Sequence, residues 1–76
     1  MRNIEVEVQF GVGNRIVRSF PDGTTIGQIV NDEAVRAALG HPSNVRPLIR
    51  RVEQSANTRA VNGDVIVLET VGTSKA

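Results

Sequence analysis

Apolar and polar residues alternate strictly over residues 4–10, which read IEVEVQF. Successive side chains of a β-strand point to opposite faces, so this alternation predicts a strand with one face buried. A turn, GVGN, occupies residues 11–14, and residues 15–20, RIVRSF, return as a second strand, so we expect the chain to open with a β-hairpin. The predicted inward side chains of the first strand are Ile4, Val6, Val8 and Phe10, and the outward ones are Glu5, Glu7 and Gln9.

The next segment changes from strand spacing to helix spacing. Residues 21–23, PDG, are turn residues, and Thr24 or Thr25 is expected to cap a helix by accepting a hydrogen bond from a free backbone N–H. Gly40 supplies the expected end of the helical segment. Residues 31–33, NDE, are a weak point because Asn and Asp favour caps over helix interiors, so we expect one helix with a break there. The apolar residues at helical spacing are Ile26, Ile29, Val30, Ala34, Ala37 and Ala38.

Two further segments complete the predicted sheet. Residues 45–54, VRPLIRRVEQ, predict a strand, a turn at Arg50 and Arg51, and a short second strand. Residues 61–64, VNGD, predict a turn, and residues 65–70, VIVLET, predict a final strand. Both faces of that last strand are apolar, as expected for a central strand covered on at least one side. The predicted element order is β-β-α-β-(β)-β, which is an α+β arrangement.

This order resembles the β-grasp fold of ubiquitin-like proteins, in which a hairpin, a covering helix and a final strand parallel to the first form one small domain. The stretch IRRVEQSANTRAVNGDVIVLETV, residues 49–71, is similar to the ending of the sulfur carriers of thiamine and molybdopterin synthesis, as is the helix entry PDGTTIGQIV. The resemblance implies a single β-grasp domain over residues 1–71, with a mixed sheet, and a flexible C-terminal tail at residues 72–76.

Two departures from the sulfur-carrier pattern bear on function. Carriers usually have Asn-Gly at the turn where this chain has Arg50 and Arg51, and they end in a Gly-Gly whose carboxylate is adenylated. This chain has only Gly72 there, followed by Thr-Ser-Lys-Ala. One hypothesis is therefore a non-enzymatic ubiquitin-like interaction module, an accessory or assembly subunit, for which a virus or mobile element is one expected setting. The other is a sulfur carrier or protein modifier that is activated at Gly72 after its tail is trimmed.

Composition narrows the function classes further. The 76 residues suffice for one domain, and the absence of cysteine removes disulfides, thiolate metal sites and cysteine nucleophiles. The single histidine, His41, has no partners spaced for a metal site, and no catalytic pair or triad is assembled. We therefore predict no cofactor, no metal and no enzyme activity. No apolar run approaches a membrane span and no signal-peptide core is present, so we expect a cytoplasmic protein, or a virion-associated one if a phage encodes it.

A cluster of arginines is the one local charge imbalance in a chain whose formal net charge is +1. Its members are Arg46, Arg50, Arg51 and Arg59. Three interpretations are open: solvated turn and strand edges, a contact to an acidic protein surface, or nucleic-acid binding. The small net charge and the lack of nearby aromatic residues disfavour nucleic acid.

A protein interface is predicted on the sheet face that carries Glu5 and Glu7, where cross-strand pairing with an arginine of the second strand is the alternative explanation. Leu48 and Ile49 are adjacent on one strand, so one of them points away from the core, and we expect it to be Ile49. The expected partner is another protein, or a second copy that binds through the sheet face or edge. The predicted interface residues are Ile49, Arg46, Arg50, Arg51, Glu5 and Glu7.

Overall fold

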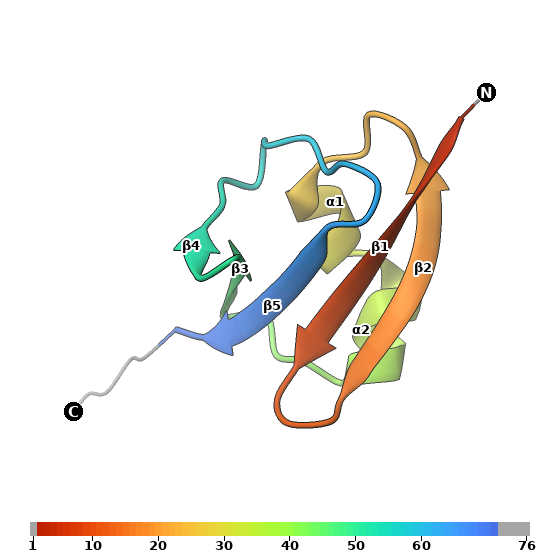
Figure 1. The fold of residues 1–76 in the computed structure, drawn as a ribbon. Coiled ribbons are helices and arrows are strands. Elements are labelled where there is room, and N and C mark those ends of the chain that lie inside the picture. The colour runs from red at the N-terminus through yellow and green to blue at the C-terminus, as the bar shows by residue number, and fades with distance from the viewer. Residues whose placement is uncertain (1, 72–76) are drawn as a thin grey trace.

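The strands form one mixed sheet, and two short helices lie against one of its faces (Figure 1). The computed structural model describes residues 2–71. The strands are β1 (Asn3–Phe10), β2 (Arg15–Pro21), β3 (Val45–Ile49), β4 (Val52–Glu53) and β5 (Val65–Thr70), and the helices are α1 (Ile26–Val30) and α2 (Glu33–Leu39). These elements follow the predicted order, and the short second strand after the arginine turn is present.

The sheet order is β2-β1-β5-β3-β4, which places the last strand of the chain in the middle of the sheet. β1 and β2 pair antiparallel, and β3 pairs antiparallel with both β5 and β4. β1 and β5 run parallel, with Glu7 opposite Val65 and Gln9 opposite Val67. The predicted β-grasp sheet, with its final strand parallel to the first, is therefore confirmed.

The predicted break in the helical segment is also confirmed, since Asn31 and Asp32 separate α1 from α2. Asp32 caps α2, because its Oδ2 accepts hydrogen bonds from the backbone N–H groups of Ala34 and Val35 at 3.1 and 3.2 Å. Thr25, one of the two predicted caps, caps α1. An aspartate that favours a cap thus starts a new helix instead of continuing the old one.

The break changes which side of the second helix faces the core. Ala37 and Ala38, predicted on the apolar side of the helical segment, are exposed, so this part of the prediction is wrong. Val35 and Leu39 are buried instead. A continuous helix would keep one 3.6-residue phase, but the extended backbone of Asp32 restarts α2 in a new orientation.

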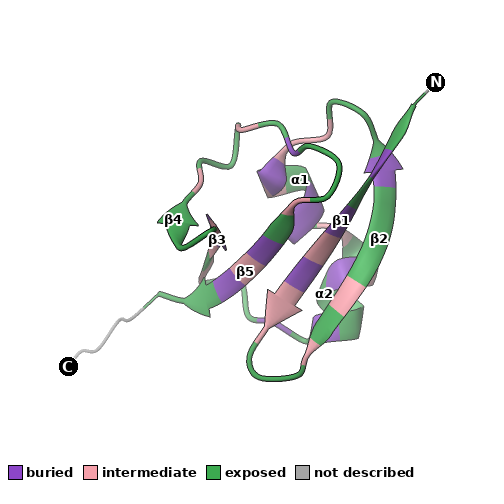
Figure 2. Ribbon diagram, viewed as in Figure 1, coloured by how far each residue is buried: buried purple, intermediate pink, exposed green. Residues whose placement is uncertain are grey.

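The core lies between the inner face of the sheet and the two helices (Figure 2). His41, which is buried, joins the helical layer to the loop before β3. Its Nε2 lies 3.1 Å from the carbonyl oxygen of Val30 at the end of α1, and its Nδ1 lies 2.8 Å from that of Pro42. His41 thus contacts the C-terminal end of α1. The core residues are Ile4, Val6, Val8, Phe20, Ile26, Ile29, Val30, Val35, Leu39, Ala60, Ile66 and Leu68.

Candidate protein-interaction face

One face of the sheet is not covered by a helix, and we call it the open face (Figure 1). Strand register assigns side chains to this face, because residues paired across neighbouring strands point in the same direction. Alternate residues of β1 enter the core, so the others, and the residues in register with them, belong to the open face. They are Glu5, Glu7 and Gln9 on β1, Arg15, Val17 and Ser19 on β2, Val65, Val67 and Glu69 on β5, Arg46 and Leu48 on β3, and Glu53 on β4.

Leu48, and not Ile49, is the aliphatic residue that β3 contributes to the open face. Leu48 lies opposite Val67, whereas Ile49 packs against the core. The expectation that Ile49 points away from the core is therefore wrong. The register gives the reason, since Pro47 lies opposite the core residue Leu68 and the residue two positions further along β3 shares its direction.

Leu48 is only 9% exposed although no helix covers it. It lines a hollow of about 500 Å³, which we call the leucine hollow. The other residues that line it are Arg46, Arg51, Val67 and Glu69. The leucine hollow therefore has aliphatic walls with charged side chains around them.

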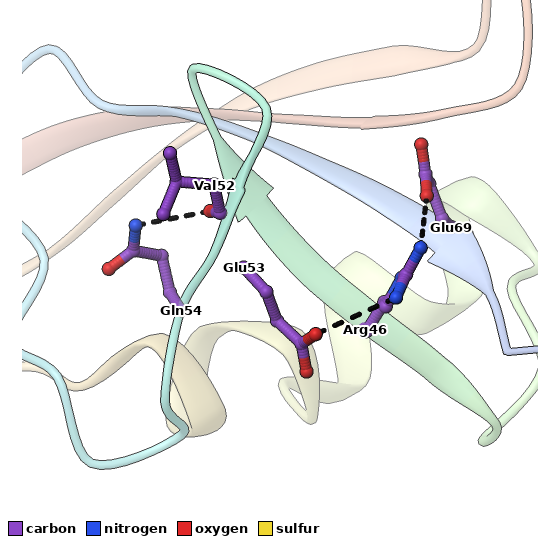
Figure 3. Close-up of polar contacts among 5 residues, drawn as sticks. All are labelled: Arg46, Val52, Glu53, Gln54 and Glu69. Atoms are coloured by element: carbon purple, nitrogen blue, oxygen red, sulfur yellow. Dashed lines mark hydrogen bonds and ion pairs between the residues drawn. The ribbon is translucent and has the colours of Figure 1, made fainter.

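Arg46 links three strands at this hollow (Figure 3). Its Nη2 donates a hydrogen bond to Glu69 Oε1 on β5 at 3.1 Å, and its Nη1 lies 3.6 Å from Glu53 Oε1 on β4. All three side chains are about half exposed, so each pair is expected to contribute less than about 1 kcal/mol to stability. The two carboxylates nevertheless outweigh the single positive charge of Arg46 within the sheet, which leaves Arg46 less available to a partner than Arg50 and Arg51.

Arg50 and Arg51 form the predicted turn between β3 and β4 in a backbone conformation that does not suit them. Their φ angles are 54° and 69°, in the left-handed region. For residues other than glycine this region costs roughly 1–2 kcal/mol per residue, which is why Asn-Gly is favoured in such turns. Within residues 2–71 neither guanidinium takes part in an ion pair.

These two arginines stand beside a second hollow of about 350 Å³, the arginine hollow. Ile49 reaches this hollow as well, although it packs against the core from its other side. The remaining residues that line it are Gly63, Asp64, Val65 and Val67. The structure thus brings three of the predicted interface residues, Ile49, Arg50 and Arg51, to one place.

Glu5 and Glu7 stand on the other side of β5. Glu7 Oε2 accepts a hydrogen bond from Gln9 Nε2 at 2.6 Å and lies 4.0 Å from Arg15 Nη1. The cross-strand pairing that the sequence offered as an alternative explanation therefore occurs, and it involves Arg15. Both glutamates line a third hollow of about 180 Å³, the glutamate hollow, together with Val6, Val17, Gly63, Asp64 and Val65.

The predicted turn at residues 61–64 fixes the boundary between the arginine and glutamate hollows. It is fastened to β1, because Glu5 donates its N–H to Asn62 Oδ1 at 2.9 Å and its carbonyl oxygen accepts from the N–H of Gly63 at 2.8 Å. Asp64 Oδ2 accepts from the N–H of Val61 at 2.9 Å. The turn therefore sets where β5 begins and places the next residue, Val65, between the two hollows.

Among residues 2–71, no group of three or more His, Cys, Asp or Glu side chains is arranged to hold a metal ion. No helix of this described segment is long and apolar enough to cross a membrane. Gly72, the glycine of the carrier hypothesis, and the tail at residues 72–76 lie outside the described residues.

Comparisons with known proteins identify the fold. No protein-family model matches the sequence, and no curated protein matches it. Among solved structures, a de novo design based on ubiquitin matches with a TM-score of 0.72 and 17% identity over 96% of each chain. The ubiquitin of Caldiarchaeum subterraneum matches with a TM-score of 0.73 and 16% identity, over 97% of this chain and 100% of that one.

The fold is therefore the ubiquitin-like β-grasp, and at these identities the likeness shows the fold alone. The similarity to sulfur carriers stays a prediction.

Proposed function

We propose that this chain is a non-enzymatic interaction module that binds a protein with its open face. The observation that carries the proposal is the set of three adjoining hollows on this face, which are lined by aliphatic side chains and bordered by charged ones. Binding surfaces between proteins combine an apolar centre with a polar rim in this way. The ubiquitin-like fold, which commonly mediates protein interactions, supports the same conclusion.

The exposed valines of the open face support the proposal further. Val17 is 57% exposed and Val65 is 40% exposed, and both flank Glu7 in the same cross-strand row. A strand residue that faces water is usually polar, so aliphatic residues in this row are better explained by contact with a partner.

The test compares two valine variants of the affinity-tagged chain in the cells that naturally express it. Val65→Glu puts a charge in the middle of the open face, whereas Val12→Glu puts the same charge on the fully exposed tip of the β1–β2 hairpin. We expect Val65→Glu to lose at least about tenfold of the co-purifying partner by quantitative mass spectrometry, as for an interface hot spot. Val12→Glu is expected to keep it. An unchanged partner set with Val65→Glu contradicts the proposal.

The carrier hypothesis keeps one supporting feature, which is that β5, the central strand, leads directly to the residue before Gly72. Mass spectrometry of C-terminal peptides from the native protein separates the two functions. A peptide that ends at Gly72 as a thiocarboxylate supports the carrier. Peptides that run through Gly72 into the tail, with none ending there, contradict it.

A further inference from the structure

Charge is divided across the open face by β5. On the β1 side, within residues 2–71, Glu5 and Glu7 are offset by Arg15 alone, which leaves an excess of one negative charge. Among the described residues that line the arginine hollow, Arg50 and Arg51 meet one carboxylate, Asp64, which leaves an excess of one positive charge there. Further along β3, Arg46 with its two partners Glu53 and Glu69 carries one net negative charge, so the positive excess is confined to the arginine hollow at the turn.

The two charged sides adjoin a shared ridge. Gly63, Asp64 and Val65 line both the glutamate hollow and the arginine hollow. Glu7 lies opposite Val65 on one side, and the turn that holds Arg50 follows β3 on the other side. From β1 to the turn, the open face therefore runs from acidic, through aliphatic, to basic.

Such a surface is complementary to itself. A two-fold axis that runs along β5, between two copies stacked face to face, exchanges the β1 side of one copy with the turn side of the other. Each glutamate hollow then meets an arginine hollow, and Val65 and Val67 of the two copies meet in the centre. An axis across the strands would instead oppose the β1 glutamates of both copies, which like-charge repulsion disfavours. Aligned packing of two sheets is a common arrangement.

We propose that the occupant of the open face is a second copy of this chain, in a two-fold dimer with Glu5 and Glu7 of one copy against Arg50 and Arg51 of the other. This rests on the proposed function, since it names the partner at the same face. The strained backbone of the two arginines agrees with it, because unfavourable φ/ψ is retained where side chains are needed for function. The dimer supplies carboxylates that the arginines lack within residues 2–71.

The test is sedimentation equilibrium of the purified full chain up to millimolar concentration, at about 20 mM and about 500 mM salt, where screening of charge pairs differs strongly. We expect a concentration-dependent monomer–dimer equilibrium with a dissociation constant that rises at least about tenfold in high salt. A chain that stays monomeric at millimolar concentration in low salt overturns the proposal.

Two charge-swapped variants make the test specific. Glu5→Arg with Glu7→Arg makes both sides of the face basic, and Arg50→Glu with Arg51→Glu makes both sides acidic. Each variant alone is expected to be monomeric, because every contact across the axis becomes repulsive. An equimolar mixture is expected to form a heterodimer, because every contact then becomes attractive. This recovery also shows that both variants are folded.

Arg36→Glu is the matched control, since Arg36 is an exposed arginine on α2, away from the open face. Its dimerisation is expected to equal that of the unmodified chain. Dimers that persist in both swapped variants place the contact elsewhere, for example on the free edge of β2, and overturn the proposal. An equimolar mixture of the two swapped variants that fails to associate overturns the proposal as well. A monomeric chain that still loses its partner through Val65→Glu refutes the dimer alone and leaves the proposed function standing.

Discussion

Leu48 and Val67 lie opposite each other across β3 and β5, on the face of the sheet that no helix covers. Their neighbours in sequence, Ile49 and Leu68, face the core instead. The same two strands therefore contribute to two layers of aliphatic packing, one closed by helices and one open at the hollows. This relationship separates residues that hold the fold together from residues that are free to serve binding.

Matched leucine truncations test that separation. Leu68→Ala removes a core side chain that is 3% exposed, and we expect it to lower the free energy of unfolding by about 3–5 kcal/mol. Leu48→Ala enlarges a hollow at the surface and leaves no closed cavity, so its expected cost is smaller, about 2 kcal/mol. Urea unfolding followed by circular dichroism measures both. Equal losses, or a larger loss for Leu48→Ala, would show that Leu48 belongs to the core after all.

The strict alternation of β1 and the turn residues after it were enough to predict the hairpin, because period-two patterning depends only on neighbouring residues. The break at Asp32 was predictable for a similar reason, since its capping bonds reach no further than Val35. Both are consequences of local chemistry. The direction of Val35 and Leu39 was not predicted, because it depends on how α2 restarts after the cap.

The choice between Leu48 and Ile49 could not be made from the sequence. Pro47, Leu48 and Ile49 are all apolar, so this part of β3 has no alternation to show which face is inward. Only the pairing with β5, some 20 residues later, decides it. The hollows were not predicted either, because each is lined by segments that are distant in the sequence. The arginine turn was predicted in position, but the sharing of its hollow with Val65 was not.

Removal of the α2 cap gives a second prediction. Asp32→Ala deletes the carboxylate that accepts from the N–H groups of Ala34 and Val35, and we expect a loss of about 1 kcal/mol in the free energy of unfolding. Asp22→Ala is the control, since this exposed aspartate lies in the turn after β2, and we expect a change within about 0.5 kcal/mol. If the two variants unfold at the same urea concentration, the break between the helices does not depend on the cap.

Gly27 on α1 gives a third prediction, because the loop after β4 passes very close to it. A Cβ at this position would lie 2.9 Å from Ala56 Cβ and 3.0 Å from Ala56 O. Gly27 also donates its N–H to Ala56 O at 2.9 Å, so the loop is not free to withdraw. We expect Gly27→Ala to cost about 1–3 kcal/mol through overpacking, although alanine in an open helix position gains about 1 kcal/mol.

The double variant Gly27→Ala with Ala56→Gly is the control for this contact. It removes the Cβ–Cβ clash and keeps the carbonyl, so part of the lost stability should return when thermal unfolding of the two variants is compared. A single variant Gly27→Ala that is more stable than the unmodified chain would mean that the loop moves away without cost.

The arginine turn gives the last prediction, in which stability and binding are expected to change in opposite directions. Replacing Arg50 and Arg51 by Asn and Gly suits the left-handed backbone of the turn, and we expect the free energy of unfolding to rise by about 1–2 kcal/mol. The same change removes both guanidinium groups from the arginine hollow, so the proposed dimer should weaken at least about tenfold.

The control replaces both arginines by lysine, which keeps the charge and the unfavourable φ, and both measurements should then stay close to those of the unmodified chain. Urea unfolding and sedimentation equilibrium on the same samples check the pair of outcomes. If the Asn-Gly variant gains stability without losing association, the turn is strained for a reason other than binding. If it gains no stability, the neighbouring strands already relieve the strain.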